Sequence, residues 1–328
     1  MESNKRKKII IIAAAAVIVA AVIAAFICFL VNQAGSSDGG AGYSETTGAN
    51  EESWSSIFYN GEEYVHDNNK SVLLFMGLDA GGDTQAEGIG SNSRCDTIIL
   101  FIMDNSDNTI QMLDMSRNSM VSVDVYEDNG NDKLYSTELQ ICMQFTYSNS
   151  LKRGSYLMKR KVAEVLGGIE IDDYLTLEMD AMVQIVDELG GLTITMEEDC
   201  TNIDEAYTEG AVVELDGAAT ERFLRYRGVE ESGTNESVRM SHHKWFMRQA
   251  FSQIKGMGAS KIQSLLNTAG DKADTSMYAD TMASLLRYSL NEEVLTVPGS
   301  VTEGVHDEYY LDNDKVKEQI ISLLYAKK

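Results

Sequence analysis

An α/β fold is predicted for most of this 328-residue chain by three observations. Short apolar runs with strand character alternate with longer segments of helical periodicity. Glycine pairs stand where two of the helices should end. No stretch of linker composition interrupts the alternation after about residue 54. Because strands alternating with helices are typical of a sheet covered by helices, we expect one α/β sandwich over residues 54–328.

The first strands are predicted from three runs. Residues 71–78 and 97–103 are almost wholly apolar, which indicates strands buried on both faces. Residues 109–115 alternate apolar and polar side chains, as a strand with one buried face does. The polar residues 105–108 form a turn between the second and third strands.

Helices follow. Residues 156–166 and 179–189 have helical periodicity, and each is followed by a Gly-Gly pair suited to a C-terminal cap. Residues 192–196 alternate as a strand. A short helix is expected from residue 216 to 222, then an extended segment over 223–227 that places Arg225 and Arg227 on one side. Further elements are expected as helices at 238–255, 281–290 and 316–324 and a strand at 294–299.

The N-terminus is predicted to anchor the chain in a membrane. Residues 5–8 are all basic, and the 23 residues from Ile9 to Val31 are apolar without interruption. At about 1.5 Å per residue this run crosses a hydrocarbon core of about 30 Å. Basic flanking residues place residues 1–8 in the cytoplasm. The polar residues 32–53 then form a flexible tether, and residues 54–328 form the extracellular domain.

Three other interpretations of the apolar run are weaker. It is longer than the apolar region of a cleaved signal peptide, and Asn32 spoils the best cleavage site. A lipoprotein anchor on Cys28 would require a small residue before the cysteine, where Ile27 stands. A buried core helix does not suit the basic flank and the polar tether. A single-pass cell-membrane protein is therefore expected.

The net charge has opposite signs on the two sides of Val31. Residues 1–31 hold four basic side chains and one acid, so +3 of the total −24 belongs to them and −27 to the rest. An external part this acidic is unsuited to binding nucleic acid, and could bind divalent cations. The simpler alternative is a charge that only keeps the domain soluble. Outside the anchor, Cys95, Cys142 and Cys200 show no zinc-binding spacing, and either one disulfide or three free thiols is possible.

Candidate site residues stand at strand ends. Asp79 follows the first strand and Asp96 precedes the second, so neighbouring strands would bring both to one sheet edge. Two carboxylates there could bind Mg²⁺, with Mn²⁺ as an alternative ion, although turn-capping is the simpler role. Several arginines at element ends could bind an anionic, phosphate-bearing ligand, or form ion pairs with the surplus acids. They are Arg94, Arg117, Arg225, Arg227 and Arg239. His242 and His243 are adjacent on a helix, so their rings diverge and a structural role is expected.

These segments, in this order, resemble the LytR–CpsA–Psr family of cell-wall enzymes. The matching segments are VLLFMGLDA at 72–80, RCDTIILFIMD at 94–104, IQMLDMSRNSMV at 110–121, the stretch 166–194, LDGAATERFLRYRGVE at 215–230 and VRMSHHKWF at 238–246. The resemblance covers about residues 70–255. It implies a three-layer α-β-α sandwich around a mixed central sheet, with a deep apolar groove for a polyprenyl chain.

The resemblance also implies an activity. It is the Mg²⁺-dependent transfer of a glycopolymer from a polyprenyl-pyrophosphate carrier to peptidoglycan, with formation of a phosphodiester, in a Gram-positive-type bacterium. Asp79 and Asp96 match the metal-linked acids, and the five arginines match those that bind phosphate. Arg117, Asp96 and Arg225 are the residues expected to be catalytic.

Some positions depart from the family pattern. Ser116-Arg117-Asn118 stands where Pro-Arg-Asp is usual, Ala80 follows Asp79 where an arginine is common, and His242-His243 replaces an arginine and a glutamine. The alternatives to an active transferase are therefore a non-catalytic paralogue that binds polyprenyl phosphate, or a regulator of envelope assembly.

Overall fold

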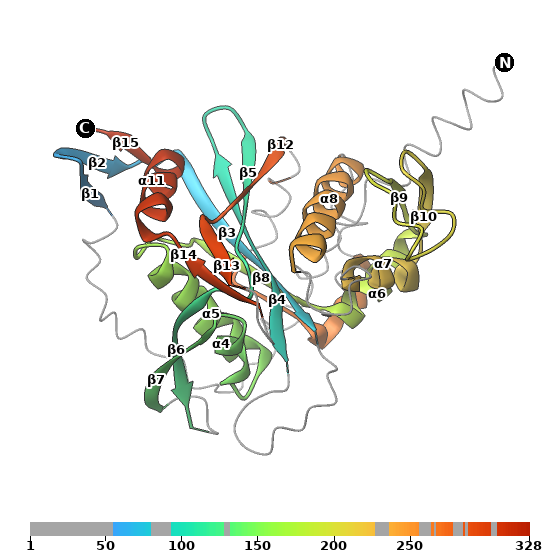
Figure 1. The fold of residues 1–328 in the computed structure, drawn as a ribbon, viewed down its shortest axis with the longest axis horizontal. Helices are drawn as coiled ribbons and strands as arrows, with labels where there is room; N and C mark the ends of the chain where they lie inside the picture. Colours follow the sequence, from blue (N-terminus) through green and yellow to red (C-terminus); the bar gives the residue numbers. More distant parts are fainter. Residues whose placement is uncertain are drawn as a thin grey trace.

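The fold is built on a mixed six-stranded sheet of order β11-β8-β3-β4-β5-β12 (Figure 1). The computed structural model describes residues 55–79, 93–127, 132–226, 236–255, 264–265, 267–277, 285, 288–302 and 307–328. Strands β3–β8 and β5–β12 pair in parallel, and the other neighbours pair antiparallel. The strands are β3 (Lys70–Asp79), β4 (Arg94–Asp104), β5 (Thr109–Asp114), β8 (Asp173–Glu178), β11 (Ala273–Thr275) and β12 (Ser289–Thr296).

Helices cover both faces of this sheet, as Figure 1 shows. One face packs against α4 (Met143–Thr146), α5 (Leu151–Val165) and α11 (Asn313–Leu324), with one core that contains Leu74, Phe145 and Ile320. The other face packs against α6 (Met179–Leu189), α7 (Gly217–Arg225) and α8 (Glu236–Ile254), with a second core that contains Phe75, Ile185 and Phe223. The predicted α/β sandwich with a mixed central sheet is confirmed, and the two cores on opposite faces make it three-layered.

Smaller sheets lie outside the six-stranded sheet. Each is a hairpin or a hairpin with one added strand. Their strands are β1 (Ser56–Tyr59), β2 (Glu62–His66) and β15 (Tyr325–Lys327); β6 (Met120–Tyr126) and β7 (Lys133–Gln140); β9 (Leu192–Thr195) and β10 (Val212–Leu215); β13 (Gly299–Thr302) and β14 (Glu308–Leu311). A short 3₁₀ helix, η1 (Gly270–Lys272), precedes β11.

Two sequence-based predictions were wrong in detail. Helix α7 continues through Arg225, although an extended segment was expected from residue 223. Buried positions 219, 220, 223 and 224 lie on one helical face, which favours the helix. The helix expected over 281–290 ends too late, because Ser289 and Leu290 pair with β5 as part of β12. The rest of that predicted helix lies almost wholly outside the described residues.

The predicted anchor also lies outside the described residues. Among the residues that the structure describes, none of the helices is long and apolar enough to cross a membrane.

Gly217 lets α7 approach α6 closely. Its N–H donates to Asp187 Oδ1 at 2.8 Å, and a Cβ added there would lie 2.4 Å from the carbonyl oxygen of Val183. Gly217→Ala is therefore expected to destabilise the fold by about 1–3 kcal/mol, seen as a lower Tm. The control is Ala218→Ser on the exposed face, expected to stay within about 0.5 kcal/mol. Equal Tm values for the two variants would contradict this packing.

Candidate active site

A β-bulge places Asp96. In the β3–β4 register Gly77 lies opposite Thr97 and Leu78 opposite Cys95, so Asp96 is an extra residue on β4. A bulge re-aims side chains, because it interrupts the alternation of faces. The neighbours Asp96 and Thr97 accordingly line the same cavity. Asp79, at the end of β3, lines that cavity as well.

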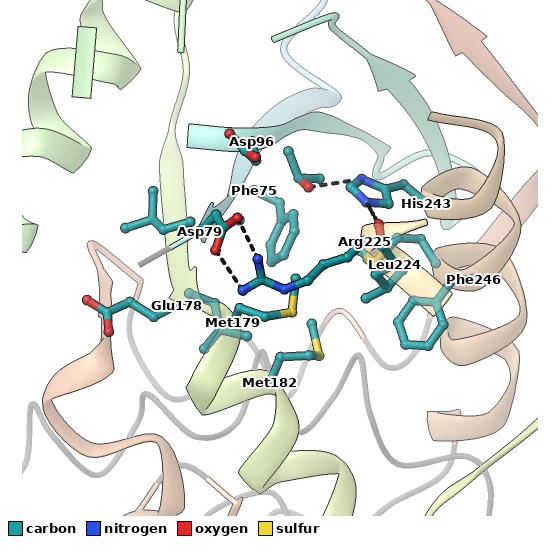
Figure 2. Close-up of a pocket in the computed structure, with 15 residues that line it drawn as sticks. Phe75, Asp79, Asp96, Glu178, Met179, Met182, Leu224, Arg225, His243 and Phe246 are labelled. Carbon is teal, nitrogen blue, oxygen red and sulfur yellow. Dashed lines mark hydrogen bonds and ion pairs between the residues drawn. The ribbon is translucent and has the colours of Figure 1, made fainter. Parts of the chain in front are cut away.

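The cavity lies among the ends of β3, β4 and β8 and the helices α6, α7 and α8, and its volume is about 150 Å³. Figure 2 shows the side chains of Phe75, Met179, Met182 and Phe246 around the charged pair of Asp79 and Arg225. The apolar lining includes Phe75, Leu177, Met179, Met182, Phe246 and Met247. An apolar interior beside a charged edge suits an amphiphilic ligand with a charged head.

Arg225 and Asp79 form a bidentate ion pair at this edge (Figure 2). The two guanidinium nitrogens Nη1 and Nη2 each lie 2.7 Å from an Asp79 carboxylate oxygen. Nε of Arg225 also donates to Glu221 Oε1 at 2.9 Å. Burial disfavours the charged guanidinium, but the bonds to Asp79 and Glu221 outweigh it and raise the pKa of Arg225. Arg225 thus stays charged and is held toward the cavity.

Arg117 and Asp96 form the second ion pair, with Nη1 2.6 Å from Oδ2. Arg117 is buried, and its Nη2 also approaches the Cys142 sulfur at 3.5 Å. Arg117 does not itself line the cavity, whereas Asp96 does. The arginine therefore stands behind the carboxylate and holds Asp96 in position. Asn118, also buried, follows it where the family pattern has an acid.

Cys95 and Cys142 flank this ion pair but are poor nucleophile candidates. Both are free and buried, and burial is the main cause that raises the pKa of each thiol above its ordinary value. The charge of Asp96 raises the pKa of Cys95 further, and the nearby Arg117 only partly opposes the rise for Cys142. Because the thiolate is the reactive form, both sulfurs stay unreactive at neutral pH.

His243 reaches the cavity from α8. Its Nε2 lies 3.0 Å from the carbonyl oxygen of Leu224, and its Nδ1 lies 3.0 Å from the hydroxyl of Thr97 (Figure 2). Because a carbonyl only accepts, Nε2 donates, and in the neutral ring Nδ1 then accepts from Thr97. The His243 ring therefore connects Thr97 of β4 to Leu224 of α7, the residue before Arg225.

The two hydrogen bonds of His243 can be tested by substitution. His243→Ala leaves a buried carbonyl and hydroxyl without this partner, and should destabilise the protein by about 1–3 kcal/mol. His243→Gln should recover much of the loss, since an amide can donate to Leu224 and accept from Thr97. Denaturant unfolding measures both variants. Equal destabilisation by alanine and glutamine would show that ring packing, not hydrogen bonding, is what matters.

The remaining predicted site residues are Arg94, Arg227 and Arg239, and the structure describes the side chain of only the first. Arg94 is exposed at the start of β4 and lies opposite Asp79 in the strand register. Arg227 lies outside the described residues. Arg239 is on α8, but its side chain is not among those described. Asp79, Asp96 and Arg225 thus line the cavity, and Arg117 pairs with one of them.

Glu178 is a cavity residue that the sequence analysis missed. It ends β8 and lies opposite Leu78 in the parallel register. Burial raises its pKa, and Lys272 only partly opposes that rise. The sequence signal that could have identified Glu178 is an acid at the end of a strand, which is the pattern that identified Asp79. The donor chemistry around the cavity suits a hard cation, since Asp79, Asp96 and Glu178 offer only oxygen ligands.

Fold and site together define an α/β protein with paired acids and arginines at the edge of an apolar cavity. The chain belongs to the LytR_cpsA_psr family, whose sequence profile matches residues 33–322.

Two curated relatives are similar over most of the chain. "Biofilm regulatory protein A" of Streptococcus mutans is 22% identical over 281 residues, which cover 79% of this chain and 66% of that protein, just under two thirds. The "polyisoprenyl-teichoic acid–peptidoglycan teichoic acid transferase TagU" of Halalkalibacterium halodurans is 24% identical over 247 residues, which cover 73% of this chain and 72% of that protein.

Solved structures share the fold. B. subtilis TagV has a TM-score of 0.57 at 19% identity, with 78% of this chain and 97% of that chain covered. A structure of TagT bound to LIIa-WTA has a TM-score of 0.57 at 16% identity, covering 78% of this chain and 90% of that one.

Proposed function

We propose that this protein transfers a glycopolymer from a polyprenyl-pyrophosphate carrier to peptidoglycan and so makes a phosphodiester bond. The polymer is of the wall teichoic acid, capsular or other secondary wall class. The observation that carries the proposal is the apolar cavity with Asp79, Asp96 and Arg225 at its edge. Membership of the family and the activity named for the TagU relative support it.

Each part of the site has a role in this proposal. The methionine and phenylalanine lining would bind the first isoprenoid units of the carrier by burying apolar surface. Arg225 would bind the pyrophosphate, because a guanidinium matches two phosphate oxygens. Arg225 is paired with Asp79, so it would exchange this carboxylate for phosphate, with Glu221 still fixing its Nε.

Asp79 and Asp96 would bind Mg²⁺ or Mn²⁺, and Glu178 lines the same cavity. The bound cation would supply charge compensation for the pyrophosphate as the bond to the carrier breaks. Arg117 would keep the Asp96 carboxylate oriented through their 2.6 Å contact. When Arg225 releases Asp79 to bind phosphate, the Asp79 carboxylate would become available to the cation.

The proposed reaction balances without a covalent enzyme intermediate. A peptidoglycan hydroxyl attacks the phosphorus that bears the glycan, the bond from that phosphorus to the bridging oxygen breaks, and polyprenyl phosphate leaves. The hydroxyl proton is released. The chain's contribution is therefore to position the carrier and to stabilise the added negative charge.

We also propose that residues 9–31 hold the protein in the cell membrane, with residues 1–8 in the cytoplasm and the domain outside, joined by residues 32–53. A membrane-held carrier makes such an anchor useful, since enzyme and substrate share one surface.

A second candidate is an envelope-assembly regulator, or a paralogue that binds the carrier without transfer. Asn118 beside Arg117, where the family pattern has a carboxylate, and the name of the S. mutans relative, a biofilm regulatory protein, favour it.

One assay separates these candidates. Full-length protein in detergent is incubated with a lipid-linked glycan pyrophosphate, Mg²⁺ and peptidoglycan, and the glycan content of the peptidoglycan is measured. Glycan transfer that requires Mg²⁺ is the expected result. Tight carrier binding without transfer would favour the non-catalytic paralogue. Absence of both would favour the regulator and overturn the proposed function.

A further inference from the structure

A second cluster of ligand-type side chains lies around His242, the neighbour on α8 of the cavity-lining His243. Glu198 and Cys200 lie in the loop between β9 and β10, and His242 comes from α8. The Nε2 of His242 lies 3.1 Å from Glu198 Oε1 and 3.7 Å from Cys200 Sγ, and all three ligand atoms lie within 4.8 Å of one another. The cluster is built from nitrogen, sulfur and oxygen, unlike the oxygen-only set at the cavity.

The orientation of the His242 ring points its lone pair into this cluster. Nδ1 lies 3.3 Å from the carbonyl oxygen of Phe223, which can only accept, so Nδ1 carries a proton. In the neutral ring Nε2 is then an acceptor that faces a second acceptor, the Glu198 carboxylate. One proton, on Nε2 or on the sulfur, can serve the contact of Nε2 with Glu198 or the contact of Nε2 with Cys200, but not both. A cation between the three atoms can be bound by all of them. Metal-binding histidines commonly donate their other N–H to a backbone carbonyl in this way.

The three side chains are held in place before any ligand binds. Stacking on Phe223, with centroids 4.6 Å apart and planes 6° apart, fixes the His242 ring. The Cys200 N–H donates to Tyr207 at 2.8 Å and the Met196 N–H to Ala211 at 2.8 Å, which closes the loop upon itself. Glu198 and Cys200 are two residues apart, and both side chains face the same nitrogen, Nε2 of His242.

We propose that Glu198, Cys200 and His242 bind one Zn²⁺ ion. Zinc binds sulfur, nitrogen and oxygen at about 2.0–2.3 Å, so tetrahedral ligand atoms stand roughly 3.3–3.8 Å apart, which the two measured contacts nearly match. Mg²⁺ does not suit the set, because it prefers oxygen. His242 and Cys200 are buried while Glu198 is exposed, so the fourth position faces solvent and can hold water.

The ion would link the β9–β10 loop to α8, and through the Phe223 carbonyl to α7, which ends at Arg225. Its role is therefore structural support for the helix that carries Arg225. The inference is independent of the proposed transfer reaction.

The test uses full-length protein in detergent, stripped with a chelator and reloaded with Zn²⁺ or Co²⁺ alone. One metal ion per chain, a thiolate charge-transfer band with Co²⁺, and a higher Tm with Zn²⁺ are expected. Loss of an outer-shell partner alone costs about 10–100-fold in metal affinity, so loss of Cys200 or His242 should cost more than about 100-fold.

Variants make the test specific. Cys200→Ser should abolish the band, and Glu198→Gln, at an exposed position that tolerates substitution, should weaken affinity without unfolding the protein. Glu197→Gln is the matched control, because Glu197 pairs with Arg248 instead. No bound metal in the folded protein, or full binding by both variants, would overturn the proposal and leave an imidazolium–glutamate ion pair.

Discussion

Arg117→Ala is expected to reduce glycan transfer about 10²–10³-fold, the usual loss when one preorganised charge is removed from an active site. Arg117 lies behind Asp96, so the variant also removes the group that orients this carboxylate. Removing one partner of a buried pair costs about 3–5 kcal/mol of stability, so folding and turnover must be measured together. The measurement is turnover per folded molecule in the transfer assay.

The matched control for Arg117 is Arg153→Ala. Arg153 is buried to a similar degree, and its guanidinium packs over the rings of Tyr126 and Tyr156, away from the cavity. This variant should lose stability but retain turnover per folded molecule. Arg117→Lys should retain most stability and still transfer poorly, since an ammonium lacks the planar fork of a guanidinium. Unchanged transfer by Arg117→Ala would show that the enzymatic role drawn here is wrong.

Asp79→Asn should raise the Mg²⁺ concentration needed for half-maximal transfer more than about 10-fold, equal to roughly 1.4 kcal/mol of binding free energy. The amide keeps the size of the side chain and can still accept a bond from Arg225, but it lacks the charge that a hard cation prefers. A Mg²⁺ titration of the transfer rate measures the shift.

Glu221→Gln is the control for Asp79→Asn. Glu221 also holds Arg225, through Nε, but it does not line the cavity. The Glu221→Gln variant should therefore need the same Mg²⁺ concentration for half-maximal transfer as the unchanged protein. If both variants shift the requirement equally, Asp79 acts by holding Arg225 and not by binding the cation. If neither shifts it, the cation binds elsewhere.

Much of the central sheet could be predicted, because its strands carry strong local signals. The apolar runs of β3 and β4 and the Gly190 cap of α6 were each identified, and Gly190 adopts the left-handed conformation such a cap needs. Of the edge hairpins, β9 was predicted within residues 192–196, but most of the other strands were missed, since strands such as β7 are exposed along most of their length and have no buried apolar face. Their pairing depends on neighbours distant in sequence.

The sequence by itself determined which acids and arginines to consider, because residue type and position at a strand end depend only on local order. Tertiary structure decided the pairings: Arg225 with Asp79, 146 residues apart, and Arg117, three residues after β5, with Asp96 on β4. The bulge that turns Asp96 toward the cavity, and the meeting of His242 with Cys200, also have no local signal. Such contacts arise only when the sheet register and helix packing bring remote segments within a few ångströms.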